Sequence, residues 1–178
     1  MKKKAEAVNQ YNFQSSDQLL LDTNIWLFLY GPQSPKNNPK VGIYSQAFNK
    51  ILQAKSHIYI DALIVSEFIN RYARIRQDLI SSKVSFKRFR QSPEFQAIAS
   101  DIVADVKRVL RHCIQIECDF ETLAMDDLLD EFKTGNFDFN DQVLTALCKK
   151  RKLKLVTDDG DFDTAEISVL TANIALLK

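Results

Sequence analysis

The sequence is short of the residues that build turns and cross-links. Its 178 residues include only 4 Gly, 4 Pro and 3 Cys. So few Gly and Pro residues argue against an all-β fold, which needs many turns, and against a disordered or low-complexity chain. Helices are therefore expected to dominate one globular domain of ordinary composition, with 46% hydrophobic and 26% charged residues.

Cysteine usage and net charge exclude further classes. Cys113, Cys118 and Cys148 form no C-x-x-C pair and have no His at zinc-ligand spacing, so we expect free thiols in a reducing compartment rather than a zinc site or a disulfide framework. The 24 basic and 23 acidic residues give a net charge of +1. Because this balance creates no overall field for a nucleic acid or a membrane, any such partner must be argued from local charge.

The sequence also lacks a long hydrophobic run. The most apolar stretch, residues 19–30, is interrupted by Asp22, Thr23 and Asn24, and it is much shorter than the roughly 20 residues of a membrane-spanning helix. The basic residues 1–4 are followed by mostly polar residues, not by the apolar core of a signal peptide. These features predict a soluble, cytoplasmic protein with no membrane partner.

Short apolar runs alternate with segments of helical periodicity. Strands are expected at residues 19–21, 57–60, 113–116, 153–156 and 167–170, and helices at 41–52, 61–79, 93–110, 122–133 and 140–151. The proline-rich residues 31–39 are the clearest loop. Strands that alternate with helices are typical of an α/β fold with a mainly parallel sheet.

Charges of opposite sign are segregated along this nearly neutral chain. Residues 117–141 carry nine acids against Lys133, a local −8, whereas residues 71–90 carry seven basic residues against Asp78, a local +6. Phe86 and Phe89 lie within the basic stretch. Two interpretations of this stretch stay open: it holds phosphates while a phenylalanine stacks on a base, or it is a solvated helix face with two core phenylalanines.

Acidic residues follow two of the predicted strands directly. Asp22 comes after the first strand, and Asp158, Asp159 and Asp161 come after the fourth. In an open parallel sheet, ligands bind beyond the carboxyl ends of the strands, at the point where the strand order reverses. If these two strands are neighbours at that point, their acids converge although more than 130 residues separate them in sequence.

Two further acids lie beside predicted core faces. Glu67 follows Ile64 by three residues, and Asp141 precedes Leu144 by three, so both carboxylates are placed where burial is costly unless they are paired or bind a metal. Taken singly, each acid has an ordinary explanation as a helix cap, a first-turn acid or part of a turn. Four acids at one sheet edge, without a basic neighbour in sequence, together predict an Mg²⁺ or Mn²⁺ site.

Other catalytic arrangements have less support. His57 and His112 have no adjacent Ser, Cys or Asp motif that would suggest a nucleophilic triad. The four glycines are isolated, so no phosphate-binding loop is present. A phosphatase that uses the same carboxylates is a further candidate, but no second Asp lies two residues after Asp22, as an aspartyl nucleophile motif would have it.

Four segments resemble the PIN-domain ribonucleases, the family of the VapC-type toxins. They are LLLDTN at residues 19–24, VSEF at 65–68, NDQVLTAL at 140–147 and LVTDDGDF at 155–162. The resemblance implies a three-layer α/β/α sandwich with a parallel sheet of about five strands, formed by residues 1–178, with a helical extension at about 71–112. It also implies cleavage of RNA with Mg²⁺ or Mn²⁺.

The resemblance assigns roles to individual residues. It places the catalytic, metal-binding acids at Asp22, Glu67, Asp141 and Asp159, with Asp161 as a further ligand, and Asn24 and Thr157 as residues that orient the loops. Asp158 lies where the family varies. Five basic side chains are the weaker candidates for RNA contacts: Arg71, Arg74, Lys87, Arg88 and Arg90.

The resemblance also suggests partners. If the protein is a toxin, a small antitoxin protein should occupy the acidic groove, with basic side chains paired to the acids in place of metal. Residues 31–39 and 71–115 lie outside the resemblance and are candidates for a homodimer contact or a substrate groove. The alternative function is a non-catalytic PIN-like module that binds RNA or protein, although such a module would be expected to have lost some of the acids.

Overall fold

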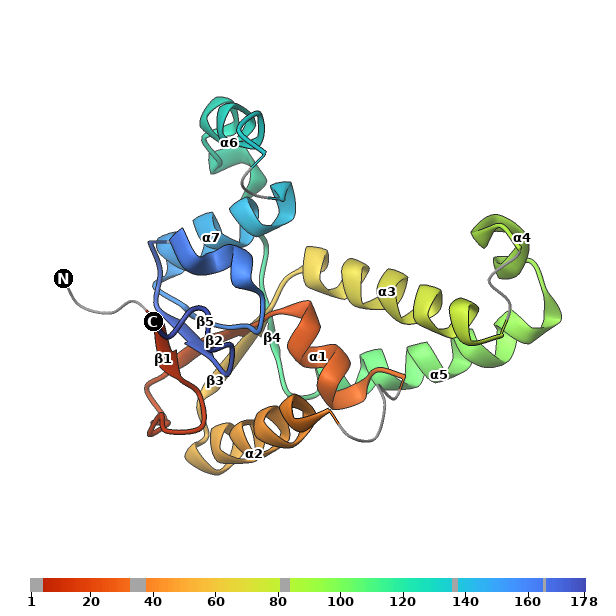
Figure 1. Cartoon of the computed structure of the whole chain (residues 1–178), viewed down its shortest axis with the longest axis horizontal. Helices are drawn as coiled ribbons and strands as arrows, with labels where there is room; N and C mark the ends of the chain where they lie inside the picture. The colour runs from red at the N-terminus through yellow and green to blue at the C-terminus, as the bar shows by residue number, and fades with distance from the viewer. Residues whose placement is uncertain (1–4, 33–37, 81–83, 136–137, 165) are drawn as a thin grey trace.

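A six-stranded sheet forms the centre of the computed structural model, which describes residues 5–32, 38–80, 84–135, 138–164 and 166–178. The strand order is β1-β6-β5-β2-β3-β4, and every neighbouring pair is parallel (Figure 1). The strands are β1 (Ala5–Ala7), β2 (Gln18–Leu21), β3 (His57–Ile60), β4 (Ile114–Gln115), β5 (Lys154–Val156) and β6 (Val169–Thr171). The predicted α/β fold with a parallel sheet is confirmed.

The sheet has one strand more than the expected five. The additional strand is β1, which pairs with β6 in the register Ala5 to Val169. Its sequence, AEA, has neither β-branched nor aromatic residues, so local sequence gives no strand signal. Pairing with the buried strand β6 is therefore what makes this segment extended.

The helices follow the predicted periodic segments closely. They are α1 (Thr23–Tyr30), α2 (Pro39–Ala54), α3 (Ala62–Ile80), α4 (Phe86–Arg90), α5 (Pro93–Leu110), α6 (Met125–Phe132) and α7 (Phe139–Arg151), with 3-10 turns at Phe120–Thr122 and Gly160–Thr164. Residues 33–37 of the predicted loop lie outside the described residues. None of the helices in the described ranges combines the length and apolar character that crossing a membrane requires.

Helix starts are set by side-chain caps. Asp61 Oδ1 accepts a hydrogen bond from the Ile64 backbone N–H at 2.9 Å, so Asp61 caps α3. Ser92 caps α5, and Pro93 takes the first helical position, where its missing N–H costs nothing. The Asp61 cap fixes where α3 leaves the sheet, and the Ser92 cap fixes where α5 begins after α4.

The core surrounds the central strand. Leu19, Leu20 and Leu21 of β2 are completely buried, as is Trp26 of α1. Helices α2 and α7 lie on opposite sides of the sheet (Figure 1), so β2 is covered on both faces and reads as a continuous apolar run. The edge where β2 ends therefore rests on the best-packed part of the molecule.

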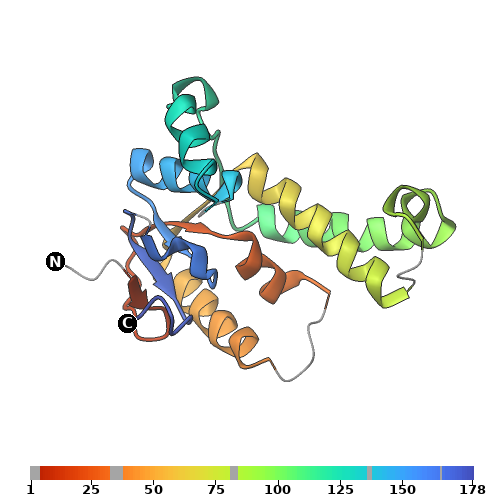
Figure 2. The same ribbon diagram turned by 45° about the horizontal axis from the view of Figure 1, so that its top comes forward.

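Helices α3, α4 and α5 form an arm that projects from the sheet. Helices α3 and α5 run side by side, and α4 lies at the far end of the pair (Figures 1 and 2). Tyr72 on α3, Phe89 on α4 and Ile102 on α5 are buried within the arm. The short helix α4 was not expected from the sequence, and Gln77 Nε2 fixes its approach by donating to Val84 O at 2.5 Å.

Candidate active site

The order of the strands explains why distant acids meet. Strand β2 has β3 on one side and β5 on the other, so the strand order reverses between β2 and β5. Leu21 and Val156 are paired across these two strands, and Asp22 and Thr157 follow them directly. The two strands, which the sequence alone could not show to be neighbours, are adjacent, and the Asp22 N–H donates to Val156 O at 3.0 Å.

Asp22 is the most enclosed acid of this edge, with 6% of its surface exposed. Its Oδ1 accepts from the Thr23 N–H at 2.6 Å, which caps α1. Its Oδ2 accepts from Asn24 Nδ2 at 2.6 Å and from Thr157 Oγ1 at 2.7 Å. One carboxylate therefore both caps α1 and belongs to the acidic group, and three hydrogen-bond donors hold it in place.

Glu67 reaches the same edge from the second turn of α3. Its Oε2 accepts from Thr23 Oγ1 at 3.2 Å, and its Oε1 forms an ion pair with Arg71 Nη1 at 3.1 Å. Thr23 is fully buried and links Asp22 to Glu67 through its N–H and its hydroxyl. Sequence reasoning overlooked Thr23, although its position between Asp22 and Asn24 is the signal that would have found it.

Asp141 and Asp159 complete the group from two other elements. Asp141 is half-buried in the first turn of α7. Asp159 lies after β5, where its backbone N–H donates to Thr157 Oγ1 at 3.0 Å. Asp161 is exposed, and its N–H donates to Asp159 Oδ1 at 3.1 Å. These bonds form the polar turn that the sequence predicted after this strand.

The four acids share one electrostatic field. Burial first, and then repulsion from Glu67 and Asp159, raise the pKa of Asp22 to about 6, although hydrogen bonds from Thr157 and Thr23 oppose the shift. Burial and the charges of Asp22, Asp159, Asp138 and Glu67 raise the pKa of Asp141 to about 7. The charges of Glu67 and Asp159 therefore make ionisation of Asp22 and of Asp141 more costly.

The donor set has the chemistry that a hard divalent cation requires, because all four groups offer carboxylate oxygens. Within the described ranges, no three His, Cys, Asp or Glu side chains are grouped closely enough to hold a metal ion as they stand. Oxygens of Asp22 and Glu67 instead face Thr23, Asn24, Thr157 and Arg71. The set therefore fits such an ion by charge and atom type, without a pre-assembled cage.

Asp158 points into a separate network that the sequence did not suggest. It pairs with Lys40 Nζ at 2.5 Å, and its Oδ1 lies 2.9 Å from the hydroxyl of the buried Tyr44. That hydroxyl also lies 3.1 Å from Thr157 O and accepts from the Ala172 N–H at 2.8 Å. Helix α2 and the end of β6 thereby hold the loop that carries Asp159. Helical spacing predicted only a helix at residues 41–52, so no sequence signal indicated the Tyr44 hydroxyl.

The remaining candidates lie away from the four acids. Arg74 and Arg90 lie over the Phe86 ring, while Lys87 and Arg88 are exposed on α4. His112 Nε2 lies 3.1 Å from the Tyr30 hydroxyl, and the three cysteines are free thiols, as predicted. Lys83, one of the seven basic residues of the stretch, is outside the described residues.

Comparisons with known proteins identify a matching family model and several similar solved structures. A family model described as PIN domain matches residues 19–167. A chain of the crystal structure of VapBC2 from Rickettsia felis, bound to a DNA fragment from their promoter, is 14% identical with a TM-score of 0.54, and the match covers 86% of this chain and 98% of that one. PAE2754 from Pyrobaculum aerophilum is 16% identical with a TM-score of 0.51, covering 97% and 94%. FitAcB from Neisseria gonorrhoeae is 20% identical with a TM-score of 0.44, covering 85% and 96%. No curated protein matches significantly.

The raised pKa values predict how stability depends on pH. The folded-state pKa values of Asp22 and Asp141 lie above the ordinary value of 3.8, so the folded protein binds more protons than the unfolded chain in this range. Their contribution to stability is complete below about pH 4 and is lost as the pH rises through 6 and 7. In buffer with EDTA, urea unfolding should therefore show higher stability at pH 5.5 than at pH 7.5.

Asp141→Asn should remove a large part of this dependence. The Asp141 carboxylate accepts no hydrogen bond from the described residues, so the amide removes its charge without breaking a side-chain contact. We expect the variant to be more stable than the parent at pH 7.5 by about 1–2 kcal/mol, allowing for partial exposure, and unchanged at pH 4. Asp127→Asn, on exposed α6, is the control. Equal effects of both variants would contradict the coupling.

Tyr44→Phe should loosen the loop that carries Asp159. The change leaves the Ala172 N–H without its acceptor and frees Asp158 and Thr157 from α2, and a buried unsatisfied group costs about 1–3 kcal/mol. Hydrogen exchange should show faster opening of amides 157–161, and urea unfolding should show the lost stability. The matched control is Tyr59→Phe, because no hydrogen bond among the described residues uses that hydroxyl. Unchanged exchange in Tyr44→Phe would show that α2 does not hold the loop.

Proposed function

Because the chain belongs to the PIN domain family, we propose that it is an endoribonuclease that hydrolyses RNA phosphodiester bonds with Mg²⁺ or Mn²⁺. The observation that carries the proposal is the coupled group of carboxylates at the switch point of the sheet. Asp22, Glu67, Asp141 and Asp159 come from four separate segments. The charges of Glu67 and Asp159 nevertheless raise the pKa of Asp22, and the charges of the other three raise the pKa of Asp141. A fold without a use for a cation gains nothing from this repulsion.

Each acid has a defined task in this proposal. Asp22, Glu67, Asp141 and Asp159 would hold the ion, and the exposed Asp161 would add a ligand at the rim of the site. When bound, such an ion supplies an acidified water and offsets negative charge on the phosphate. Asp141, whose pKa is raised to about 7, would give up its proton as it takes on this task, because metal ligands bind in their deprotonated form.

The neighbouring polar groups support the acids. Asn24 and Thr157 both donate to Asp22 Oδ2 and lie 3.2 Å from each other. Because these donors are themselves held in place, the Asp22 carboxylate keeps one orientation. It is therefore already oriented for the reaction and need not rearrange as the reaction proceeds. This supports the role of Asn24 and Thr157 as orienting residues.

Water is the nucleophile in this proposal. Neither histidine of the described residues takes part in the acidic group: His57 begins β3, and His112 contacts Tyr30. Hydrogen bonds to Asp22 and Glu67 occupy the hydroxyls of Thr157 and Thr23. The chain's own contribution is therefore to collect negative charge, exclude bulk water from Asp22 and orient the ligands.

We extend the proposal to a toxin that acts in the cytoplasm and is inhibited by a small antitoxin protein. The likeness to a chain of VapBC2 supports the comparison in fold, and the site supports the chemistry of the partner. Arg71 already pairs with Glu67 at 3.1 Å, so a guanidinium is an acceptable counter-ion for this carboxylate. Basic side chains of an antitoxin would satisfy the remaining acids in the same way.

Cleavage assays test the proposed activity. A panel of labelled RNAs and single-stranded DNAs should be cut with Mg²⁺ or Mn²⁺ and not with EDTA. The double variant Asp22→Asn, Asp159→Asn should lose activity by on the order of 100-fold or more, since it removes two ligands. The matched control is Asp126→Asn, Asp127→Asn, which removes the same charge from the exposed helix α6.

Two results would contradict the assignment. An active Asp22→Asn, Asp159→Asn variant would show that the cleavage comes from another site or another protein. Failure of the parent to cut any member of the panel, together with failure to bind Mn²⁺ in calorimetry, would favour the non-catalytic binding module.

A further inference from the structure

The arm carries a cationic cluster that the acidic site does not use. The Arg74 guanidinium carbon lies 4.7 Å from the centre of the Phe86 ring, and that of Arg90 lies 5.7 Å from it. Lys87 and Arg88 are exposed on the same short helix, α4. We call these five residues the tip cluster. It joins the side of α3 to the far end of the arm.

The two phenylalanines, for which the sequence left a base-stacking and a core interpretation open, have different roles. Phe89 is buried and packs edge-on against Phe95 at 5.4 Å, so it is a core residue and offers no surface for a base. Phe86 is half-buried against Phe89, and two guanidiniums lie close to its ring. Cation–π contact restricts the movement of both arginine side chains. The Phe86 ring therefore positions two guanidiniums and is not left open for a base to stack on.

The cluster is set on a firm base. Ser85 caps α4, Gln77 Nε2 donates to Val84 O, and Ser92 caps the following helix. Helix α4 contacts both α3 and α5. The position of Phe86 is therefore fixed by the arm, and side chains that are placed in advance lose less freedom when they bind a ligand.

The charges of the tip cluster have no acidic partner. Among the described residues, no Asp or Glu forms an ion pair with Arg74, Lys87, Arg88 or Arg90, whereas other arginines of the arm are paired, Arg76 with Asp101 and Arg108 with Asp105. Four like charges repel one another unless an anion lies between them. A ligand with several regularly spaced negative charges can pair with more of these side chains than a single small anion can.

The face of α3 connects this cluster to the acidic site. Glu67, Arg71 and Arg74 are spaced by four and three residues, so they lie along one side of the helix. A helix rises about 1.5 Å per residue, which places Arg74 about 10 Å along the axis from Glu67. A stacked nucleic-acid strand advances about 3.4 Å per nucleotide, so this separation corresponds to about three nucleotides.

We propose that the tip cluster binds the RNA backbone about three nucleotides from the cleaved bond, on one side of it only. This inference rests on the proposed nuclease function for its direction and reference point. Phosphate contacts position a strand without reading its bases. The arm therefore sets a minimum length for the substrate on that side, and sequence selection must come from elsewhere.

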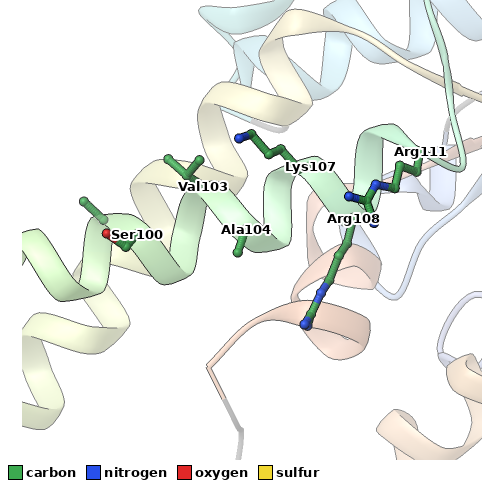
Figure 3. Close-up of a pocket in the computed structure, with 7 residues that line it drawn as sticks. Ser100, Val103, Ala104, Lys107, Arg108 and Arg111 are labelled. Carbon is green, nitrogen blue, oxygen red and sulfur yellow. The ribbon is translucent and has the colours of Figure 1, made fainter.

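A second basic surface provides a matched comparison. Lys107, Arg108 and Arg111 line a shallow hollow on α5 together with Ser100, Val103 and Ala104 (Figure 3). This surface has a similar charge, but it lies on another helix from Glu67, and Arg108 is paired with Asp105 at 3.1 Å. A strand that follows α3 would leave this hollow empty, so its variants serve as controls.

Binding can be measured without cleavage. Fluorescence anisotropy with a labelled 20-nucleotide oligouridylate in EDTA should show that Arg74→Gln, Arg90→Gln weakens binding about tenfold. The slope of log affinity against log salt should fall by about 1.4, because each single-strand phosphate contact contributes about 0.7. Phe86→Leu keeps every charge and should weaken binding about threefold through loss of the ring that restricts the arginines. Lys107→Gln, Arg111→Gln should change neither quantity.

These measurements separate the inference from the nuclease proposal. Unchanged affinity and salt slope in Arg74→Gln, Arg90→Gln would overturn the RNA site whether or not the protein cuts RNA, and would favour a protein partner for the arm. The opposite pattern, with the loss in Lys107→Gln, Arg111→Gln, would overturn it equally. Altered binding by a protein that cuts nothing would support the tip cluster while contradicting the nuclease proposal.

Truncated substrates test the placement. With an RNA that the parent protein cuts at a single position, shortening one end to two nucleotides beyond the cleaved bond should raise KM about tenfold and leave kcat unchanged, whereas the same shortening of the other end should have little effect. Arg74→Gln, Arg90→Gln should raise KM for the long substrate and have no further effect on the shortened one. Equal sensitivity to both ends would overturn the one-sided path along α3.

Discussion

Repulsion among carboxylates at the end of a buried strand is the constraint around which this structure is organised. Asp22 is nearly enclosed and lies in the fields of Glu67 and Asp159, so the chain loses stability by ionising it. Three donors oppose that cost: the first N–H of α1, an amide and a hydroxyl. These hydrogen bonds cap α1, connect the ends of β2 and β5, and orient the Asp22 carboxylate. A change to the helix start would therefore also change the acidic group.

The rest of the fold keeps these charges in place. The buried leucines of β2 fix the strand from which Asp22 emerges. Glu67 comes from the second turn of α3 and Asp141 from the first turn of α7, both near the helix starts. The loop after β5 has no such support of its own. Tyr44 supplies it, by joining that loop to α2 and to the end of β6 through one hydroxyl. Through these hydrogen bonds, the loop that carries Asp159 is held in a fixed position relative to the sheet.

Local pattern predicted the parts of this arrangement that local sequence determines. The apolar run at 19–21 and the acid that follows it placed Asp22 at a sheet edge, and helical period placed Glu67 and Asp141 beside the core. Features that depend on distant pairing were missed. Strand β1 is extended because of β6, and the Tyr44 hydroxyl acts on a carbonyl 113 residues away. The sequence left the role of Phe86 open, and two arginines, one twelve residues before it and one four residues after it, lie at its ring.

The separation between the acidic group and the tip cluster suits the two tasks that the proposed nuclease would combine. A group of carboxylates attracts a cation but repels the phosphate backbone, so basic residues are needed to hold RNA. Basic residues too near the acids pair with them instead, as Arg71 does with Glu67. At physiological ionic strength, exposed charges are largely screened beyond about 8 Å. The tip cluster begins just beyond that distance along α3, where it is free of the acids and still within reach of the same strand. A net charge of +1 therefore conceals two local fields of opposite sign, whose separation suits the proposed nuclease.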